Sequence, residues 1–180
     1  MQREKKELIS EWYDEHSHSV LSYTLMMVRD YQQAEDLTHE TFVKAFIHYD
    51  SFKGNSSVKT WLFSIAHNLT VDFLRKRKPI PILKELLAGK PDEGPLPEDM
   101  VLIQENSEAL YKAIGKIKET HREIIILRKI KGFTIEETAK ILNCSESKVK
   151  SVLFRALPAL EKQLLKEGFF HEGEVRESHY

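Results

Sequence analysis

The sequence predicts an all-α protein in which a proline-rich linker joins two small helical domains. Apolar residues recur at steps of three and four positions in both halves of the chain, and no stretch alternates strictly as a half-buried strand would. Five of the six prolines fall between residues 79 and 106, where they disfavour helix. We therefore expect domains at 1–78 and 107–167, a flexible acidic linker at 79–106 and an acidic tail at 168–180.

The first domain is expected to contain three helices. Its apolar positions follow a helical period over residues 9–28, 34–49 and 62–73. The segment 50–57 separates the second helix from the third, because its glycine and asparagine favour a turn and Ser57 can cap the helix that follows.

The second domain is expected to contain four helices, of which the last two form a helix-turn-helix. Thr120–Glu123 and Thr134–Glu137 each have the capping-box pattern that opens a helix. Asn143 tolerates a left-handed conformation and Ser145 can cap a last helix that ends near residue 165. Two helices joined by so short a turn are typical of DNA-binding motifs, whose second helix can enter the major groove.

The formal net charge of -1 hides an uneven distribution of charge. Residues 1–78 hold 11 basic and 11 acidic side chains, and residues 107–167 hold 13 and 8. The segments 79–106 and 168–180 hold 2 against 6 and 1 against 3. The second domain therefore carries +5 between two acidic segments, so near-neutrality of the whole chain does not exclude a nucleic-acid-binding protein.

Several classes of site are not indicated. The single cysteine, Cys144, excludes an intrachain disulfide and a multi-cysteine zinc site. His16 and His18 point to different sides of a helix, and the P-loop, GxSxG and GxGxxG patterns do not occur. We expect no metal, no cofactor and no catalytic residues, so the protein is not expected to be an enzyme. Without a signal peptide or a membrane-length apolar run, a cytoplasmic location is expected.

The strongest functional signal lies in the last predicted helix. Lysine and arginine can contact phosphates and guanine edges, and phenylalanine can pack on a thymine methyl group. The residues that offer such groups are Lys148, Lys150, Ser151, Phe154 and Arg155. An ordinary helical hairpin with solvated lysines is the alternative. Agreement of capping, turn and local charge favours DNA binding.

A second signal runs from Lys53 to Lys78. Aromatic faces beside cations can hold the unstacked bases of a separated strand, and Asn68 could read a base edge. Alternatively, Trp61 belongs to the core and Arg75–Lys78 complements the dipole at a helix C-terminus. The residues themselves leave both interpretations open.

A third signal is the polar face of the segment 33–49. It carries Asp36, His39, Glu40 and Lys44, which could meet a protein partner. A solvated helix face is the simpler explanation, and the charges alone do not favour the partner.

Three segments together resemble the extracytoplasmic-function (ECF) group of bacterial RNA polymerase sigma factors, group 4 of the sigma-70 family. They are Ala34–Phe46, Trp61–Arg77, and Arg122–Leu142 with Val149–Ser151 and Phe154–Ala156. The likeness spans roughly residues 8–165 and keeps the family's order and spacing. It implies a two-domain helical protein that binds core RNA polymerase and directs promoter-specific transcription initiation in an extracytoplasmic stress response.

The resemblance also implies roles for individual residues. Docking on the clamp coiled coil of the largest polymerase subunit falls to Asp36, Leu37, Glu40, Phe42 and Lys44. Capture of a flipped base of the minus-ten element falls to Phe52, Lys53, Gly54, Asn55, Ser56, Ser57 and Asn68. Strand opening falls to Trp61, Arg75, Lys76 and Arg77. Recognition of the minus-thirty-five element is assigned to Lys148, Lys150, Ser151, Phe154 and Arg155. An anti-sigma factor, often membrane-bound in the family, is a further implied partner, and no small-molecule substrate is implied.

Three features depart from the family pattern. Ser64 and His67 stand where arginines are common, and Ser147-Lys148 replaces a Gly-Thr pair. The common Arg-Ala-Arg reads Arg155-Ala156-Leu157. Pro158 follows and is expected to kink or interrupt that helix.

Two other functions stay open from the sequence. One is a duplex-binding regulator that uses only the helix-turn-helix, and the other is a polymerase-binding adaptor without promoter melting. Residues 53–78 discriminate against the regulator, which would not need them.

Overall fold

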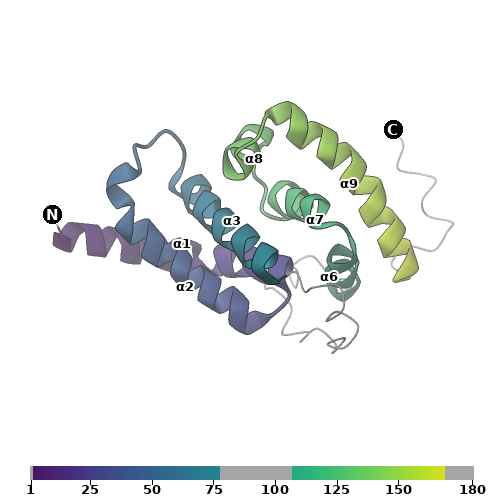
Figure 1. Cartoon of the computed structure of the whole chain (residues 1–180), viewed down its shortest axis with the longest axis horizontal. Coiled ribbons are helices and arrows are strands. Elements are labelled where there is room, and N and C mark those ends of the chain that lie inside the picture. The colour runs from purple at the N-terminus through teal and green to yellow at the C-terminus, as the bar shows by residue number, and fades with distance from the viewer. Residues whose placement is uncertain (1, 78–106, 169–180) are drawn as a thin grey trace. The chain divides into compact units, whose positions relative to one another are not determined.

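The computed structural model describes residues 2–77 and 107–168, and within these ranges every regular element is a helix. The helices form two compact groups, α1–α3 in purple to teal and α6–α9 in green to yellow (Figure 1). The prediction of an all-α chain with two small helical domains is therefore confirmed. The predicted linker at 79–106, and the tail from residue 169 onward, lie outside the described residues. No helix in the described ranges is long and apolar enough to cross a membrane.

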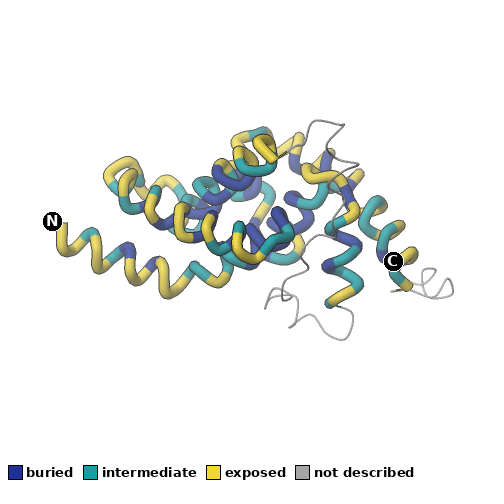
Figure 2. Tube along the Cα trace, turned by 60° about the horizontal axis from the view of Figure 1, so that its bottom comes forward, coloured by how far each residue is buried: buried dark blue, intermediate teal, exposed yellow. Residues whose placement is uncertain are grey.

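The first group consists of α1 (Gln2–Val28), α2 (Tyr31–Ile47), the short 3-10 helix η1 (Tyr49–Ser51) and α3 (Val58–Arg77). Each of the three long helices packs against the other two. Burial of one large apolar side chain contributes about 1.5–3 kcal/mol, so their shared interior is the main stabilising element. The apolar side chains that are at most 1% exposed there include Val20, Tyr23, Met26, Met27, Leu62, Phe63 and Ala66. The first turns of α1 are mostly exposed (Figure 2).

Buried threonines fix how α1 and α2 meet. The Thr24 hydroxyl lies 3.1 Å from the Val20 carbonyl oxygen and 3.3 Å from the Thr38 hydroxyl. Thr38 donates to the Ala34 carbonyl at 2.7 Å. These bonds satisfy polar atoms that would be costly to bury alone. At the junction, Asp30 caps α2 by accepting a hydrogen bond from the Gln33 amide at 3.0 Å.

The second group consists of α6 (Ser107–Lys116), α7 (Glu119–Ile125), the π-helical turn η2 (Ile126–Ile130), α8 (Ile135–Leu142) and α9 (Glu146–Lys166). Both α6 and α7 pack against α9. A cluster of the buried residues Ile117, Ile125 and Ala156 joins them, and Ala159 and Leu160 pack on it. The core therefore supports one side of α9 along several turns.

The helix ends of the helix-turn-helix follow the predicted chemistry. The Thr134 hydroxyl accepts from the Glu137 amide at 3.1 Å, and the Glu137 carboxylate accepts from the Thr134 amide at 2.7 Å. Asn143 adopts φ 49°, and Ser145 accepts from the Lys148 amide at 3.2 Å. Gly132, at φ 74°, follows the end of the preceding helix, where glycine adopts a left-handed conformation without strain. These side chains define where α8 and α9 begin.

The predicted capping box at Thr120–Glu123 is wrong. The helix begins one residue earlier, at Glu119, and no side chain caps it. Arg122 instead reaches back to the end of α6, where it donates to the carbonyl oxygens of Ile114 and Gly115 at 3.1 Å and 3.0 Å. Both carbonyls belong to the last turn of α6, where the amides that a longer helix would supply are missing, so a cation there adds hydrogen bonds and complements the helix dipole.

The proline in α9 does not interrupt the helix. The helix runs from Glu146 to Lys166 with Pro158 inside it. Pro158 is exposed, whereas Ala156, Ala159 and Leu160 hold the neighbouring turns against the core. Packing on both sides of the proline therefore offsets the hydrogen bond that its missing N–H removes.

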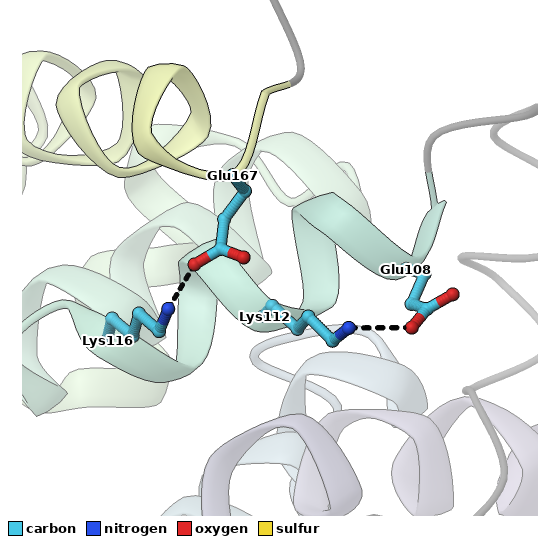
Figure 3. A network of polar contacts seen from close by, with 4 residues as sticks. All are labelled: Glu108, Lys112, Lys116 and Glu167. Atoms are coloured by element: carbon cyan, nitrogen blue, oxygen red, sulfur yellow. Dashed lines mark hydrogen bonds and ion pairs between the residues drawn. The ribbon is translucent and has the colours of Figure 1, made fainter.

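Surface ion pairs tie the outer turns of the second group (Figure 3). Lys116, at the end of α6, pairs with Glu167 just after α9 and so joins two segments far apart in the sequence. Within α6, Lys112 donates to Glu108 at 2.7 Å. This hydrogen bond, with the positive charge of Lys112, lowers the pKa of Glu108 from its ordinary value of 4.5.

Candidate nucleic-acid interfaces and docking surface

The last helix separates a buried face from a polar one. Val149, Val152 and Ala156 are buried at the helical spacing that faces the core. All five residues predicted to face the minus-thirty-five element are exposed: Lys148, Lys150, Ser151, Phe154 and Arg155. Phe154 is 81% exposed, which is unusual for a large apolar ring. The exposed face therefore combines cations with an unpacked aromatic group.

Arg155 lies along this face in the protein alone. Its Nε atom donates to the Ser151 carbonyl at 3.3 Å, and its terminal nitrogen donates to the Ser151 hydroxyl at 3.3 Å. Both residues are exposed, so these long hydrogen bonds compete with water. The guanidinium thus remains available to a phosphate or a base edge.

The segment between η1 and α3 forms an exposed loop. Lys53, Gly54, Asn55 and Ser57 are exposed and Ser56 is half-buried. Gly54 has φ 71°, a conformation that a side chain would strain. As predicted, Ser57 caps α3 by accepting from the Thr60 amide at 3.1 Å. The loop therefore presents polar groups between two ordered elements.

The two aromatic residues beside this loop pack on each other. The ring centroids of Phe52 and Trp61 lie 4.9 Å apart, and both rings are half-buried. Trp12 of α1 and Tyr49 of η1 complete an aromatic cluster with them. Trp12 was missed as a site residue by the sequence reasoning, because its helical period marked it only as a core position. The remaining residues Asn68, Arg75, Lys76 and Arg77 are exposed along α3.

Two arginines at the basic end of α3 have different neighbours. Arg75 pairs with Asp72 at 2.9 Å, one turn earlier. The Arg77 guanidinium lies 5.7 Å from the Phe73 ring centroid, within the range of a cation–π contact. The helix end therefore keeps exposed positive charge close to an aromatic ring.

The docking residues predicted on α2 divide into exposed and buried groups. Asp36 and Glu40 are exposed and Lys44 is half-buried, whereas Leu37 and Phe42 are 6% and 5% exposed. The sequence reasoning missed Val43 and Ile47, which are 56% and 60% exposed. They lie seven and eleven residues after Asp36, on the same face of the helix. Two apolar residues on a face that is otherwise polar are the sequence feature that could have identified them.

An apolar groove of about 600 Å³ lies between α1 and α2. It is lined by Lys6, Ile9, Ser10, Tyr13, His39, Phe42, Val43 and Phe46. Phe42 thus reaches a concave surface through one edge although it is largely buried. The groove adjoins the exposed α2 residues Asp36, Glu40, Val43 and Ile47, and we call the groove and these residues together the docking surface.

Burial and two neighbouring charges shift the pKa of His16 on α1. Its side chain is 11% exposed and lies 3.7 Å from the Glu15 carboxylate. Burial lowers the pKa of His16 from its ordinary value of 6.5. Glu15 opposes that shift and Lys59 of α3 adds to it. His16 is therefore favoured in its neutral form.

Comparison with known proteins gives the same family over both groups of helices. Sigma-70 region 2 matches residues 12–80, and sigma-70 region 4 matches residues 107–160. The ECF RNA polymerase sigma factor SigX of Bacillus subtilis is 36% identical over 91% of this chain and 88% of its own length. SigW of the same organism is 36% identical over 77% of this chain and 79% of its own length.

Among solved structures, the chain is similar to the sigma factor RpoE of Bartonella quintana, which was crystallised in complex with the anti-sigma factor NepR. The TM-score is 0.69 with 26% identity, and the match covers 87% of this chain and 96% of that one. Matches over both groups of helices, in the same order, do not favour a regulator that uses only the helix-turn-helix. The chain belongs to the ECF sigma factors of the sigma-70 family, which bind core RNA polymerase and direct it to specific promoters.

Proposed function

We propose that the two groups of helices divide promoter recognition between them. Residues 1–78 dock on core polymerase and read and open the minus-ten element, and residues 107–167 read the minus-thirty-five element. The acidic segments 79–106 and 168–180 are the linker and the tail. This division agrees with the family regions matched at 12–80 and 107–160.

The observation that carries the proposal is the exposed face of α9. Lysines and an arginine surround a phenylalanine that is 81% exposed, on a helix capped by Ser145 and supported by the core. A helix-turn-helix places the N-terminal part of its second helix against base edges. Phe154 fits a thymine methyl group, and Lys148, Lys150 and Arg155 fit phosphates or guanine edges.

For the minus-ten element, the exposed loop supports capture of an extruded base. Lys53 and Asn55 offer a cation and an amide on a loop whose ends are ordered. Asn68 lies seven residues after Trp61, about two helical turns along the same face of α3. Phe52 and Trp61 pack on each other, so we assign their rings to shaping the loop and the edge of the opened strand rather than to deep insertion between bases.

Core polymerase engages the docking surface of α2 in this proposal. Asp36 and Glu40 supply negative charge, and Val43 and Ile47 supply exposed apolar area next to the groove. Interfaces commonly combine an apolar centre with a polar rim, and this surface has both.

We also propose the setting in which the protein acts. It supplies recognition surfaces while the polymerase supplies the chemistry, so it is not an enzyme and needs no cofactor. It works in the cytoplasm, in response to an extracytoplasmic stress, and an anti-sigma factor restrains it. The similar RpoE, crystallised with an anti-sigma factor, supports that partner.

Footprinting of the reconstituted holoenzyme on a promoter tests this division. Combined replacement of Lys148, Lys150 and Arg155 by alanine should remove upstream protection and leave minus-ten protection on a strong promoter. The control is Lys162→Ala with Lys166→Ala, two exposed lysines farther along α9. Equal loss of protection in the control, or retained upstream protection in the triple variant, would refute the assignment.

A further inference from the structure

One side chain of α1 contacts both ends of the proposed base-capturing loop. The ring centroid of Trp12 lies 5.8 Å from that of Phe52, which precedes the loop, and 6.1 Å from that of Trp61, which follows it. Both contacts are edge-on, with interplanar angles of 83° and 77°. This edge-to-face geometry is favourable for aromatic pairs. Trp12 therefore connects the two anchors of Lys53–Ser57.

The cluster around Trp12 is ordered from several sides. Trp12 is 8% exposed, and Tyr49 of η1 packs on it with centroids 5.8 Å apart. One edge of this arrangement is fixed by Lys5, whose ammonium lies 5.4 Å from the Tyr49 ring centroid and 3.4 Å from the Asp50 carboxylate. The start of α1 is thereby attached to the 3-10 helix that enters the loop.

The loop itself has few internal restraints. Its exposed residues Lys53, Gly54 and Asn55 contribute no packing to the core, and Ser57 restrains only the helix end. A segment held mainly at its ends depends on those ends for its conformation. Since both ends rest on one indole, the geometry favours control of the loop by a residue about forty positions earlier in the chain.

We propose that Trp12 is a positioning residue for minus-ten recognition, because it seats Phe52 and Trp61 and thereby holds the loop in the conformation that captures the extruded base. This inference rests on the proposed role of the loop. Loss of the indole leaves the loop in a broader ensemble. Apparent affinity falls in proportion to the fraction of molecules in the competent state, so a drop of that fraction to about a tenth gives about a tenfold loss.

The test uses holoenzyme assembled from core polymerase and full-length variants. The probe is a forked duplex in which each of the four bases is placed in turn at every single-stranded minus-ten position. The measured quantity is the ratio of the affinities for the best and the worst base. The best base depends on capture by the loop, whereas binding of the worst base does not, so we expect Trp12→Leu to lower this ratio about tenfold. Trp12→Phe, which keeps one ring, should lower it less.

Phe63→Leu is the matched control for loss of fold stability. Phe63 is fully buried in the same group of helices and contacts Tyr23 at a centroid distance of 5.4 Å, outside the Trp12 cluster. It should weaken the fold and leave the ratio unchanged. A wild-type ratio in Trp12→Leu, or an equal loss in Phe63→Leu, overturns the proposal. If Trp12→Leu does not fold, Trp12→Phe decides by the same criterion.

Asn55→Ala separates this inference from the function on which it rests. If Asn55→Ala lowers the ratio and Trp12→Leu does not, the positioning role alone fails. If Asn55→Ala and Asn68→Ala both leave the ratio intact, the base-capturing loop is refuted, and the role of Trp12 with it.

A spectroscopic measurement gives independent support. Trp12 and Trp61 are the chain's two tryptophans, so emission from Trp12→Leu and from Trp12→Phe reports on Trp61 alone. Acrylamide should quench Trp61 more readily in Trp12→Leu than in Trp12→Phe.

Discussion

The guanidinium of Arg155 rests on Ser151, one turn earlier on the exposed face of α9, with its Nε atom 3.3 Å from the Ser151 carbonyl oxygen. The arginine is thus held along its own helix in the protein alone, by contacts that are long and open to water. Contact with DNA needs only a change of side-chain rotamer, because the helix beneath it is fixed by Val152 and Ala156. This arrangement is the basis of the first prediction.

Arg155→Ala should weaken use of the upstream promoter element without weakening binding to core polymerase. One bidentate contact with a guanine edge is worth about 1–3 kcal/mol, so transcription from promoters that depend on the upstream element should fall clearly. Filter binding measures DNA affinity and a co-purification titration measures polymerase affinity. Lys162→Ala, on the same helix, is the control. Parallel loss of both affinities in Arg155→Ala would contradict the assignment.

Asn68→Ala should impair opening of duplex promoters. The Asn68 amide is proposed to contact the extruded base, and such a contact is worth about 1–3 kcal/mol. Without it, the free-energy cost of unstacking that base is offset less fully. Permanganate reactivity of thymines in the opened region should therefore decrease, and affinity for a forked, already opened template should decrease too, because the contact with the single-stranded base is lost there as well. Gln32→Ala removes another exposed amide, from the first turn of α2, and should have no effect. Unchanged reactivity in Asn68→Ala would argue against the contact.

Glu40→Lys should lower the affinity for core polymerase about three- to tenfold. Reversal of one charge at the edge of the docking surface removes a favourable contact and adds a like-charge one, an effect that high salt should reduce. Glu11→Lys makes the same change at an exposed site on α1 outside the groove. Titration of labelled protein with core polymerase measures both variants. Equal weakening by the two substitutions would mean that net charge, rather than this surface, governs docking.

Stability of the first group of helices should fall as the pH decreases below about 6.5, in part because of His16. Burial lowers the pKa of His16 in the folded protein, so the unfolded chain binds more protons in this range and acid favours unfolding. Both tryptophans lie in this group, so urea unfolding followed by tryptophan emission reports on it. His16→Gln should show a weaker dependence from about pH 7.5 to about pH 5. An identical slope in both proteins would rule out this contribution.

The sequence predicted what depends on near neighbours. The Thr134–Glu137 capping box, the left-handed Asn143 and the Ser145 cap each need residues within three positions, and all occur as predicted. The Thr120 box failed because Arg122 finds better acceptors at the end of α6, a tertiary contact that the local pattern does not reveal.

The sequence predicted most of the exposed residues of the candidate site but not the buried residue that packs beneath them. Lys148, Lys150 and Phe154 could be assigned from helix period and charge. Trp12 could not, since its partners Phe52 and Trp61 lie some forty and fifty residues away along the chain. Val43 and Ile47 are apolar residues on a polar helix face. Only the exposure of their side chains in the folded protein distinguishes them from core residues.

Run-off transcription measures whether this chain directs core polymerase to specific promoters. Purified protein is added to core RNA polymerase with genomic promoter fragments as templates. We predict discrete transcripts that require the protein, start at defined positions and are lost when both promoter elements are mutated. Core polymerase that produces no promoter-dependent transcript on any genomic template, with folded protein present in excess, would contradict the account.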